Sequence, residues 1–139
     1  MSGPLSHIKV LDLSRVLAGP WTAQTLADLG AEVIKVERPG KGDDSRAYAP
    51  PFLKDEQGNE THESAYFCAA NRGKKSITVN LSKAEGQQLV RELATQSDVL
   101  VENYKVGDLA RYGLGYEDLK KLNVPNFGIC EEIFAHHLY

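Results

Sequence analysis

The chain has 139 residues, of which 42% are apolar and 25% are charged, so it can form one globular domain with a hydrophobic core. Its net charge of -3 and sequence pI of about 5.8 argue against a nucleic-acid-binding surface, because such surfaces are usually basic. No apolar run approaches the roughly 18 residues of a membrane span, and the first residues lack the pattern of a signal peptide. We therefore expect no nucleic-acid partner, no membrane partner and a cytoplasmic location. A mitochondrial location would require a transit peptide that has been removed.

The cysteines and histidines do not indicate a metal site. Cys68 and Cys130 lack the CxxC spacing of zinc sites and are too few for a disulfide framework. The four histidines show no metal-ligand spacing with other side chains. We expect no metal and a reducing compartment.

The first forty residues show the pattern of a strand, a helix and a second strand. Residues 8–13 are β-branched and aliphatic, which predicts a strand. Pro20 suits the first turn of a helix, and apolar residues then recur at helical spacing up to Gly30, where a left-handed cap is expected. Residues 32–37 predict the second strand. This is a βαβ unit, whose strands should be parallel.

A second alternation of strand and helix follows a long polar segment. Residues 39–64 contain several prolines, glycines and charged residues and predict a long loop, a feature that is usually functional or mobile. Ser82 and Glu85 match a capping box, which predicts that a helix starts at Ser82. The other later elements are expected to be a short helix at 65–70, a strand at 75–80, a strand at 98–102, and short helices at 108–111 and 116–122.

This order of elements predicts an α/β fold with an open, mostly parallel, Rossmann-like sheet and helices on both faces. Ligands of such sheets bind beyond the carboxyl ends of the strands. Three segments should therefore converge on a site: residues 14–18, Arg38 with its loop, and residues 103–107.

Arg38 directly follows the second strand, where nucleotide-binding α/β domains place the residue that meets the adenosine ribose. An acid suits a free ribose and an arginine suits a phosphorylated one, and Glu37 and Arg38 offer both. The arginine favours the 3′-phosphate of CoA or the 2′-phosphate of NADP. The first turn has only Gly19 in place of the GxGxxG fingerprint, which argues against NADP. Alternatively, Arg38 is an exposed residue paired with Glu37 or Asp43.

Two further groups have both a ligand-binding and a structural interpretation. Arg72, Lys74 and Lys75 either meet phosphates or form a solvated basic turn. Asn103 and Tyr104 either contact a ligand or are a turn asparagine and a core tyrosine. No serine, histidine and acid can be assembled into a catalytic set, so residue spacing alone indicates no active site.

A string of ordered motifs resembles a known family. The motifs are IKVLDL at 8–13, RVLAGP at 15–20, LGAEVIKVERPG at 29–40, GDDSR at 42–46, NRGKKSI at 71–77, VENY at 101–104 and LGYEDL at 114–119. Together they resemble the family III CoA-transferases, which include the formyl-CoA, carnitine and succinate-hydroxymethylglutarate types. The resemblance spans about residues 5–123.

This resemblance implies that coenzyme A or an acyl-CoA is the substrate, with a small carboxylic acid as its partner. The positions that match the family's CoA-binding residues are Val16, Leu17, Ala18, Arg38, Val79, Asn103, Tyr104 and Arg111. Arg38 would then meet the adenosine phosphate through charge-assisted hydrogen bonds, and the backbone of the first turn would line the pantetheine.

The family's nucleophile has no match in this chain. In the family, an aspartate from a later segment attacks the thioester and forms an anhydride and then an aspartyl-CoA. The family also forms a homodimer of two interlocked rings. We therefore expect residues 1–123 to be an incomplete CoA-binding domain that is inactive alone, from a parent that moves CoA between carboxylic acids. Residues 124–139 depart from the family pattern and are expected to form a divergent tail.

Two other functions stay open on this reasoning. The parent could be an α-methylacyl-CoA racemase, because those enzymes share the same amino-terminal pattern. The chain could also be a non-catalytic binding or interaction module that caps full-length subunits or competes with them.

Overall fold

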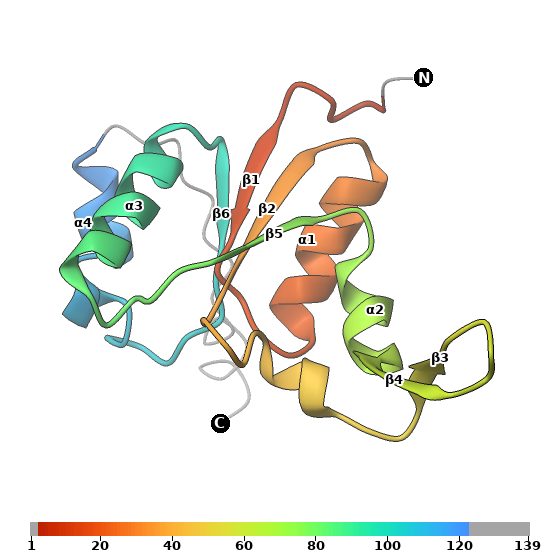
Figure 1. Ribbon diagram of the computed structural model, residues 1–139. Helices are drawn as coiled ribbons and strands as arrows, with labels where there is room; N and C mark the ends of the chain where they lie inside the picture. Colours follow the sequence, from red (N-terminus) through yellow and green to blue (C-terminus); the bar gives the residue numbers. More distant parts are fainter. Residues whose placement is uncertain (1–2, 123–139) are drawn as a thin grey trace, which may run out of the picture.

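The computed structural model describes residues 3–122, which form a central sheet with helices on both sides (Figure 1). The elements are β1 (Lys9–Asp12), α1 (Ala18–Asp28), β2 (Glu32–Glu37), the 3-10 helix η1 (Asp44–Ala47), β3 (Phe52–Lys54), β4 (Glu60–Ser64), α2 (Ala65–Asn71), β5 (Lys75–Thr78), α3 (Ala84–Thr95), β6 (Val99–Val101), the 3-10 helix η2 (Ala110–Tyr112) and α4 (Tyr116–Lys120). The tail expected at 124–139 lies outside the described residues. Across residues 3–122, no helix has the length and apolar character needed to cross a membrane.

The main sheet has four strands in the order β5-β2-β1-β6, and all neighbouring strands are parallel. This confirms the predicted α/β fold with its mostly parallel sheet. The chain first builds the sheet from β1 through β2 to β5 and then returns to place β6 on the other side of β1. Such a reversal of strand order opens a crevice at the carboxyl ends of the two strands that flank it. Here those strands are β1 and β6.

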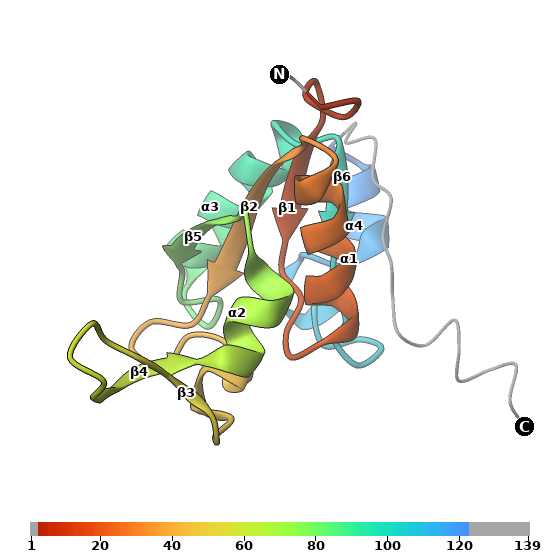
Figure 2. The ribbon, with the colours of Figure 1, turned by 90° about the vertical axis from the view of Figure 1, so that its right-hand side faces the viewer.

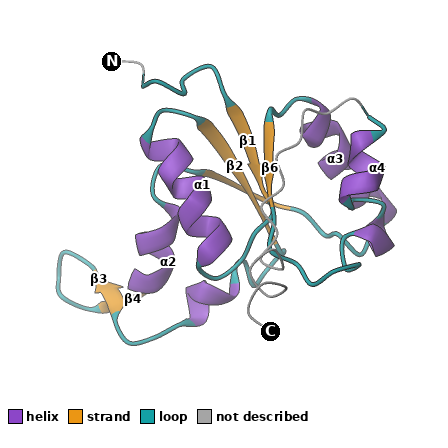
Figure 3. Ribbon diagram, turned by 180° about the vertical axis from the view of Figure 1, so that it is seen from behind, coloured by secondary structure: helices purple, strands orange, loops and turns teal. Residues whose placement is uncertain are grey.

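Both faces of the sheet are covered, with α1 and α2 on one face and α3 and α4 on the other (Figure 3). Side chains alternate between the faces along each strand. Val10 and Val33 pack in the cluster that contains Ala23 of α1, whereas Leu11 packs in the cluster that contains Val90 of α3. The β-branched and aliphatic residues of these strands, from which the sequence predicted them, therefore pack on both faces.

The two ends of α1 are defined by glycines. Gly30 has φ 102° and donates its N–H to the carbonyl of Ala27 at 2.9 Å, so the expected left-handed cap is confirmed. At the other end, a Cβ on Gly19 would lie 2.3 Å from Cβ of Ser14. The first turn of α1 therefore packs directly on the end of β1, which brings the intervening turn into the crevice.

Residues 39–64 differ from the long loop that the sequence predicts. They contain η1 and an antiparallel hairpin of β3 and β4, in which Phe52 pairs with Ser64 (Figure 2). Asp55 holds the hairpin turn by accepting the N–H groups found two and four residues later. Most of the hairpin is exposed, so it lacks the apolar alternation from which a strand is predicted.

The capping box predicted for α3 is wrong. The helix begins at Ala84, and its N-cap residue Lys83 makes no side-chain capping bond. The Oδ1 atom of Asn80 accepts both the N–H of Ser82 at 3.0 Å and its hydroxyl at 2.7 Å. Ser82 is thereby held in the turn between β5 and α3, because a nearby side chain competes for it. The bounds of the other expected elements differ by about two residues or less.

Candidate functional site

Two cavities lie at the end of the sheet where the parallel strands terminate. The strand-end cavity has a volume of about 460 Å³ and is lined by Arg15, Val36, Glu37, Arg38, Pro39, Gly42, Asp43, Val79, Asn80, Leu81, Ser82, Tyr104, Asp108, Arg111 and Tyr112. The switch-point cavity has a volume of about 380 Å³ and is lined by Arg15, Val16, Leu17, Ala18, Asp44 and Asn103. Because Arg15 lines both cavities, they adjoin at its side chain.

The sequence-predicted residues divide equally between these cavities. The strand-end cavity contains Arg38, Val79, Tyr104 and Arg111. The switch-point cavity contains Val16, Leu17, Ala18 and Asn103. The expected convergence of the segments that follow β1, β2 and β6 is therefore confirmed, whereas the role of these residues in binding CoA stays a prediction.

Asn103 joins the turn after β1 to the turn after β6. Its Oδ1 atom accepts the N–H of Arg15 at 2.8 Å, and its Nδ2 atom donates to the carbonyl of Arg15 at 2.8 Å. This two-point clamp crosses the crevice between the two strands. The amide of Asn103 therefore shapes the turn, as the structural interpretation of this residue proposed.

Val16 lies in the same turn and has an unusual backbone conformation. Its φ is 71°, in the left-handed region, where a β-branched residue is strained. The Asp43 carboxylate accepts the N–H of Val16, with oxygen distances of 3.1 and 3.3 Å. The loop after β2 thus holds the turn after β1 in a conformation that the chain would otherwise avoid.

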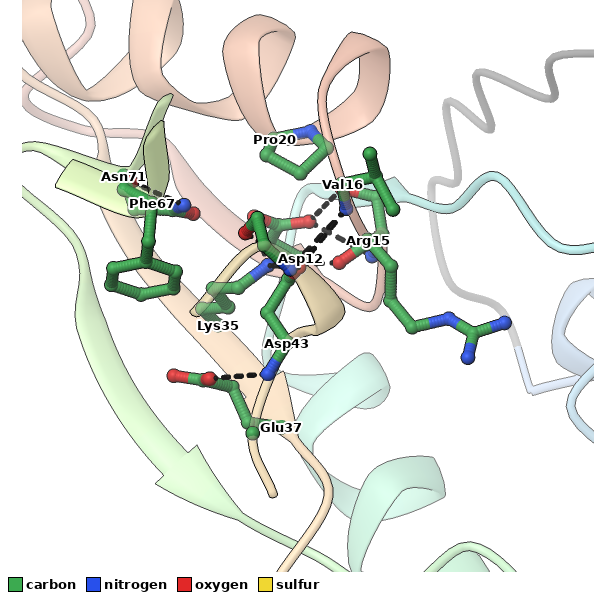
Figure 4. A network of polar contacts seen from close by, with 12 residues as sticks. Asp12, Arg15, Val16, Pro20, Lys35, Glu37, Asp43, Phe67 and Asn71 are labelled. Atoms are coloured by element: carbon green, nitrogen blue, oxygen red, sulfur yellow. Dashed lines mark hydrogen bonds and ion pairs between the residues drawn. The ribbon is translucent and has the colours of Figure 1, made fainter. Parts of the chain in front are cut away.

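Beneath this turn lie four buried charged side chains, which we call the buried ion network: Asp12, Lys35, Asp43 and Lys74. Figure 4 shows Asp12, Lys35 and Asp43 of this network. Their side chains are between 0% and 2% exposed. The Nζ atom of Lys35 lies 2.8 Å from the Asp43 carboxylate and 3.9 Å from that of Asp12, and donates to the carbonyl of Ser14 at 2.8 Å. Two positive and two negative charges therefore balance within the core.

Lys74 completes the network from the segment before β5. Its Nζ atom donates to the Asp12 carboxylate at 2.7 Å and to the Pro20 carbonyl and Asn71 Oδ1 at 2.8 Å each. A lysine has three N–H donors, so this ammonium group is saturated. Burial lowers the pKa of Lys74, while the Asp12 carboxylate opposes that change. In Asp43, burial acts to raise the pKa of the carboxyl, but the contacts with Lys35 and the hydrogen bonds from Ser45 together outweigh burial and lower the pKa.

The basic run around Lys74 does not act as a single phosphate-binding cluster. Arg72 pairs with Asp28 at 2.7 Å, and Lys75 pairs with Glu32 at 2.6 Å. Both pairs are exposed, whereas Lys74 is buried. The solvated interpretation fits Arg72 and Lys75, and neither interpretation fits Lys74.

The carboxylate of Glu37 is buried and accepts hydrogen bonds from other residues of the protein. Its carboxylate accepts hydrogen bonds from Arg46 at 2.7 and 2.8 Å, from the Ser76 hydroxyl at 2.6 Å and from the Asp43 N–H at 2.8 Å. Burial would raise the pKa of Glu37, but these donors outweigh burial and lower the pKa to about 2. Arg46 also lies over the ring of Phe67, 3.6 Å from its centroid. Glu37 is therefore a structural residue rather than the ribose-binding acid that its position suggested.

Arg38 pairs with Asp44, not with Glu37 or Asp43 as the alternative interpretation expected. Its Nε atom also donates to the carbonyl of Gly42 at 3.4 Å. The other oxygen of Asp44 lies 3.6 Å from Arg15, so one carboxylate serves two guanidinium groups. These side chains are half-exposed and available to a ligand.

Tyr104 and Arg111 supply the remaining walls of the strand-end cavity. The guanidinium of Arg15 lies 4.7 Å from the centroid of the Tyr104 ring, and burial raises the pKa of that tyrosine. Arg111 pairs with Asp108 at 2.7 Å. Three arginines beside an aromatic ring and the apolar Val79 form a wall suited to an anionic, partly apolar ligand such as a phosphorylated nucleotide.

Arg15 and Asp44 are the site residues that the sequence did not single out. Two residues separate Arg15 from the end of β1, a position from which a side chain can reach the carboxyl edge of the sheet. Asp44 lies in the loop after Arg38 that was expected to join the site, but nothing in the sequence distinguished it from the other charged residues of that loop. In the part of the chain from 3 to 122, no group of three or more His, Cys, Asp and Glu side chains is placed to hold a metal ion.

The fold and the site together define an open α/β domain with two cavities at the carboxyl ends of its parallel strands. Residues 5–126 match the model of CoA-transferase family III, and the chain belongs to that family. It is 55% identical over 127 residues to a succinate-glutarate CoA-transferase of Agrobacterium fabrum, covering 91% of this chain and 31% of that protein. A mouse succinyl-CoA:glutarate CoA-transferase is 54% identical over 127 residues, covering 91% of this chain and 27% of that protein.

Solved structures show the same relationship. A CAIB/BAIF family protein from Brucella suis superposes with a TM-score of 0.84 at 50% identity, covering 94% of this chain and 33% of that one. Rv3272 from Mycobacterium tuberculosis gives a TM-score of 0.80 at 37% identity, covering 93% of this chain and 34% of that one. The chain thus spans about a third of the length of the relatives it matches.

Proposed function

We propose that this chain binds CoA and its thioesters in the strand-end cavity, as part of an enzyme that transfers CoA between small dicarboxylic acids. The observation that carries the proposal is the grouping of Arg15, Arg38 and Arg111 with Tyr104 at the carboxyl ends of the strands, in a chain of CoA-transferase family III. The substrate class follows from relatives named for succinate and glutarate. The same names favour CoA transfer over racemisation.

In this proposal the cofactor extends from one cavity into the other. Arg38 binds the phosphate on the adenosine ribose, because it is a half-exposed cation next to the end of β2. Tyr104 and Val79 cover apolar parts of the ligand. The pantetheine then passes Arg15, which lines both cavities, and follows the backbone of residues 16–18.

Binding is tested by comparing CoA with dephospho-CoA, using calorimetry on the purified chain and on Arg38→Ala. Loss of the phosphate and loss of the guanidinium should each weaken binding by about 1.5 to 3 kcal/mol, the usual value for a charged hydrogen bond. Arg38→Ala should therefore bind the two ligands equally. Arg72→Ala is the matched control, because this exposed arginine pairs with Asp28 and lines neither cavity. Equal affinities of the wild-type chain for CoA and dephospho-CoA would remove Arg38 from the site.

We also propose that the nucleophilic aspartate belongs to another part of the whole enzyme. Such a carboxylate must attack the thioester carbonyl carbon and expel the CoA thiolate, which then attacks the resulting anhydride to give an aspartyl-CoA and the free acid. Asp12 and Asp43 are fully buried in ion pairs with lysines, and Asp44 is paired with two arginines. None of these three is placed as a free nucleophile.

A transfer assay tests this assignment. Succinyl-CoA and glutarate incubated with the purified 139-residue chain should yield no glutaryl-CoA above the rate without protein, as measured by mass spectrometry. Formation of glutaryl-CoA in proportion to protein concentration would contradict the assignment, and Asp44→Asn would then show whether Asp44 is responsible.

A further inference from the structure

Asp44 lies between two arginines of the site: Arg38, which lines the strand-end cavity, and Arg15, which lines both cavities. Arg38 comes from the residue after β2, Arg15 from the turn after β1, and Asp44 from the first residue of η1. One carboxylate oxygen contacts Arg38, and the other lies 3.6 Å from Arg15. The three side chains are 45%, 35% and 40% exposed in the order Arg38, Arg15, Asp44, so each can be reached by solvent and by a ligand.

The charge of this trio is unbalanced. Two guanidinium groups and one carboxylate leave a net charge of +1, whereas the buried ion network is neutral. An anionic ligand can supply the missing negative charge. However, a phosphate that approaches Arg38 finds its guanidinium already bonded to Asp44. A phosphate that takes hydrogen bonds from the Nη2 group of Arg38 therefore competes with the carboxylate.

We propose that Asp44 is a built-in competitor for the phosphate site at Arg38. Without a ligand, Asp44 is bonded to Arg38; when a phosphate binds, Asp44 gives up that contact and keeps its ion pair with Arg15. This inference rests on the proposed function, because it takes Arg38 as the phosphate-binding residue. Its consequence is that the chain binds phosphorylated nucleotides less tightly than Arg38 alone would allow.

The exchange needs only a small rearrangement. Asp44 already lies within ion-pair distance of Arg15, so it does not have to cross solvent to find a second partner. Exposed ion pairs are weak, because water and salt compete with them. A phosphate, which carries more charge than a carboxylate and accepts several hydrogen bonds, can therefore displace Asp44 from Arg38.

The test uses adenosine 3′,5′-bisphosphate and AMP as probes, titrated into the 139-residue chain and its variants by calorimetry. Asp44→Asn keeps the size of the side chain and removes its charge. It should bind the bisphosphate about three- to fivefold more tightly at low ionic strength, which corresponds to the worth of an exposed ion pair. The gain should be smaller for AMP, which lacks the 3′-phosphate, and should shrink as salt is added.

Two variants serve as controls. Asp28→Asn removes a carboxylate of similar exposure that pairs with Arg72 and lines neither cavity, so its affinity should match that of the wild-type chain. Asp44→Ser removes the same charge without introducing an amide, so it should show the gain in affinity even if the amide of Asn disturbs the loop. Melting curves show whether each variant is folded.

The outcomes separate this inference from the proposed function. Unchanged or weaker bisphosphate binding in folded Asp44→Asn and Asp44→Ser overturns the competitor role, since Asp44 would then be neutral or would hold Arg38 in its binding position. If the wild-type chain still prefers the bisphosphate and Arg38→Ala loses that preference, the proposed function stands. If the wild-type chain binds neither probe, both proposals fall together.

Discussion

The buried ion network and the arginines around the cavities both consist of ion pairs, but they differ in burial and in net charge. In the network, Lys35 and Lys74 face Asp12 and Asp43, and the side chains are at most 2% exposed. At the cavities, Arg15 and Arg38 face Asp44 with more than a third of each arginine exposed. The first group has neutral charge and a saturated Lys74, while the second has a surplus positive charge. The comparison shows that burial separates ion pairs that water cannot reach from ion pairs that stay open to solvent.

The physical reason is the cost of leaving a charge without its partner. Removal of one member of a buried pair leaves the other charge in a low-dielectric interior, where water cannot compensate it. At an exposed pair, water and dissolved ions take the place of the missing partner. Variants of the network should therefore change stability, and variants of the exposed arginines should change ligand affinity.

The largest expected effect comes from Lys35→Met. This substitution keeps the approximate length of the side chain but leaves the Asp43 carboxylate buried without its lysine. Loss of one partner of a buried pair should lower the free energy of unfolding by about 3 to 5 kcal/mol. Urea titration followed by circular dichroism measures this change.

Lys75→Met is the matched control for this comparison. Lys75 lies in β5 and pairs with Glu32 of the neighbouring strand, but its side chain is 72% exposed. The urea midpoint of this variant should stay close to that of the wild-type chain. If the two lysine variants were equally destabilised, burial would not be what distinguishes the two groups of charges.

Protonation of Glu37 at low pH is expected to lower the free energy of unfolding by a smaller amount. This residue is intermediate between the two groups of charges, because it is buried while its partner Arg46 is partly exposed. The folded state lowers the pKa of Glu37 from 4.5 to about 2. A lowered carboxyl pKa stabilises the fold fully above pH 4.5, and that contribution is lost as the pH falls toward 2. Between pH 5 and pH 3 the loss should be on the order of 2 kcal/mol.

The measurement compares the wild-type chain with Glu37→Gln, which cannot titrate at this position. Other carboxyl groups contribute to the pH dependence of both proteins, so the difference between their unfolding free energies at the two pH values isolates Glu37. The wild-type chain should lose more stability than the variant on acidification. Parallel pH profiles would show that Arg46 and Ser76 do not hold Glu37 in its charged form.

The elements of the main sheet could be predicted from the sequence because burial leaves a periodic trace. Residues 8–13 and 32–37 are segments of strand length that contain several β-branched and aliphatic residues, and the cap at Gly30 has a local signal. The β3–β4 hairpin leaves no such trace, because its side chains face solvent. The start of α3 was misplaced because Asn80, a residue outside the capping box, takes the hydroxyl of Ser82.

The candidate site could be predicted less completely than the fold. Position along the strands was enough to bring Arg38 and Tyr104 to the same edge of the sheet. The ion pair between Lys74 and Asp12 could not be predicted in this way, because the two residues are 62 positions apart in the chain. No sequence pattern indicates that Asp12 and Lys74 form an ion pair. The basic residues beside Lys74 were compatible with an exposed turn instead.

The clamp between Asn103 and Arg15 has a consequence for how the protein is made. The two residues are separated by 88 positions, so a ribosome completes the first strand, its turn and Arg38 long before it adds Asn103. An emerging chain therefore carries most of the positively charged groups of the site without the contact that shapes the turn. On the proposed function, CoA cannot guide the folding of this turn early in synthesis, because the clamp forms only after Asn103 has been added.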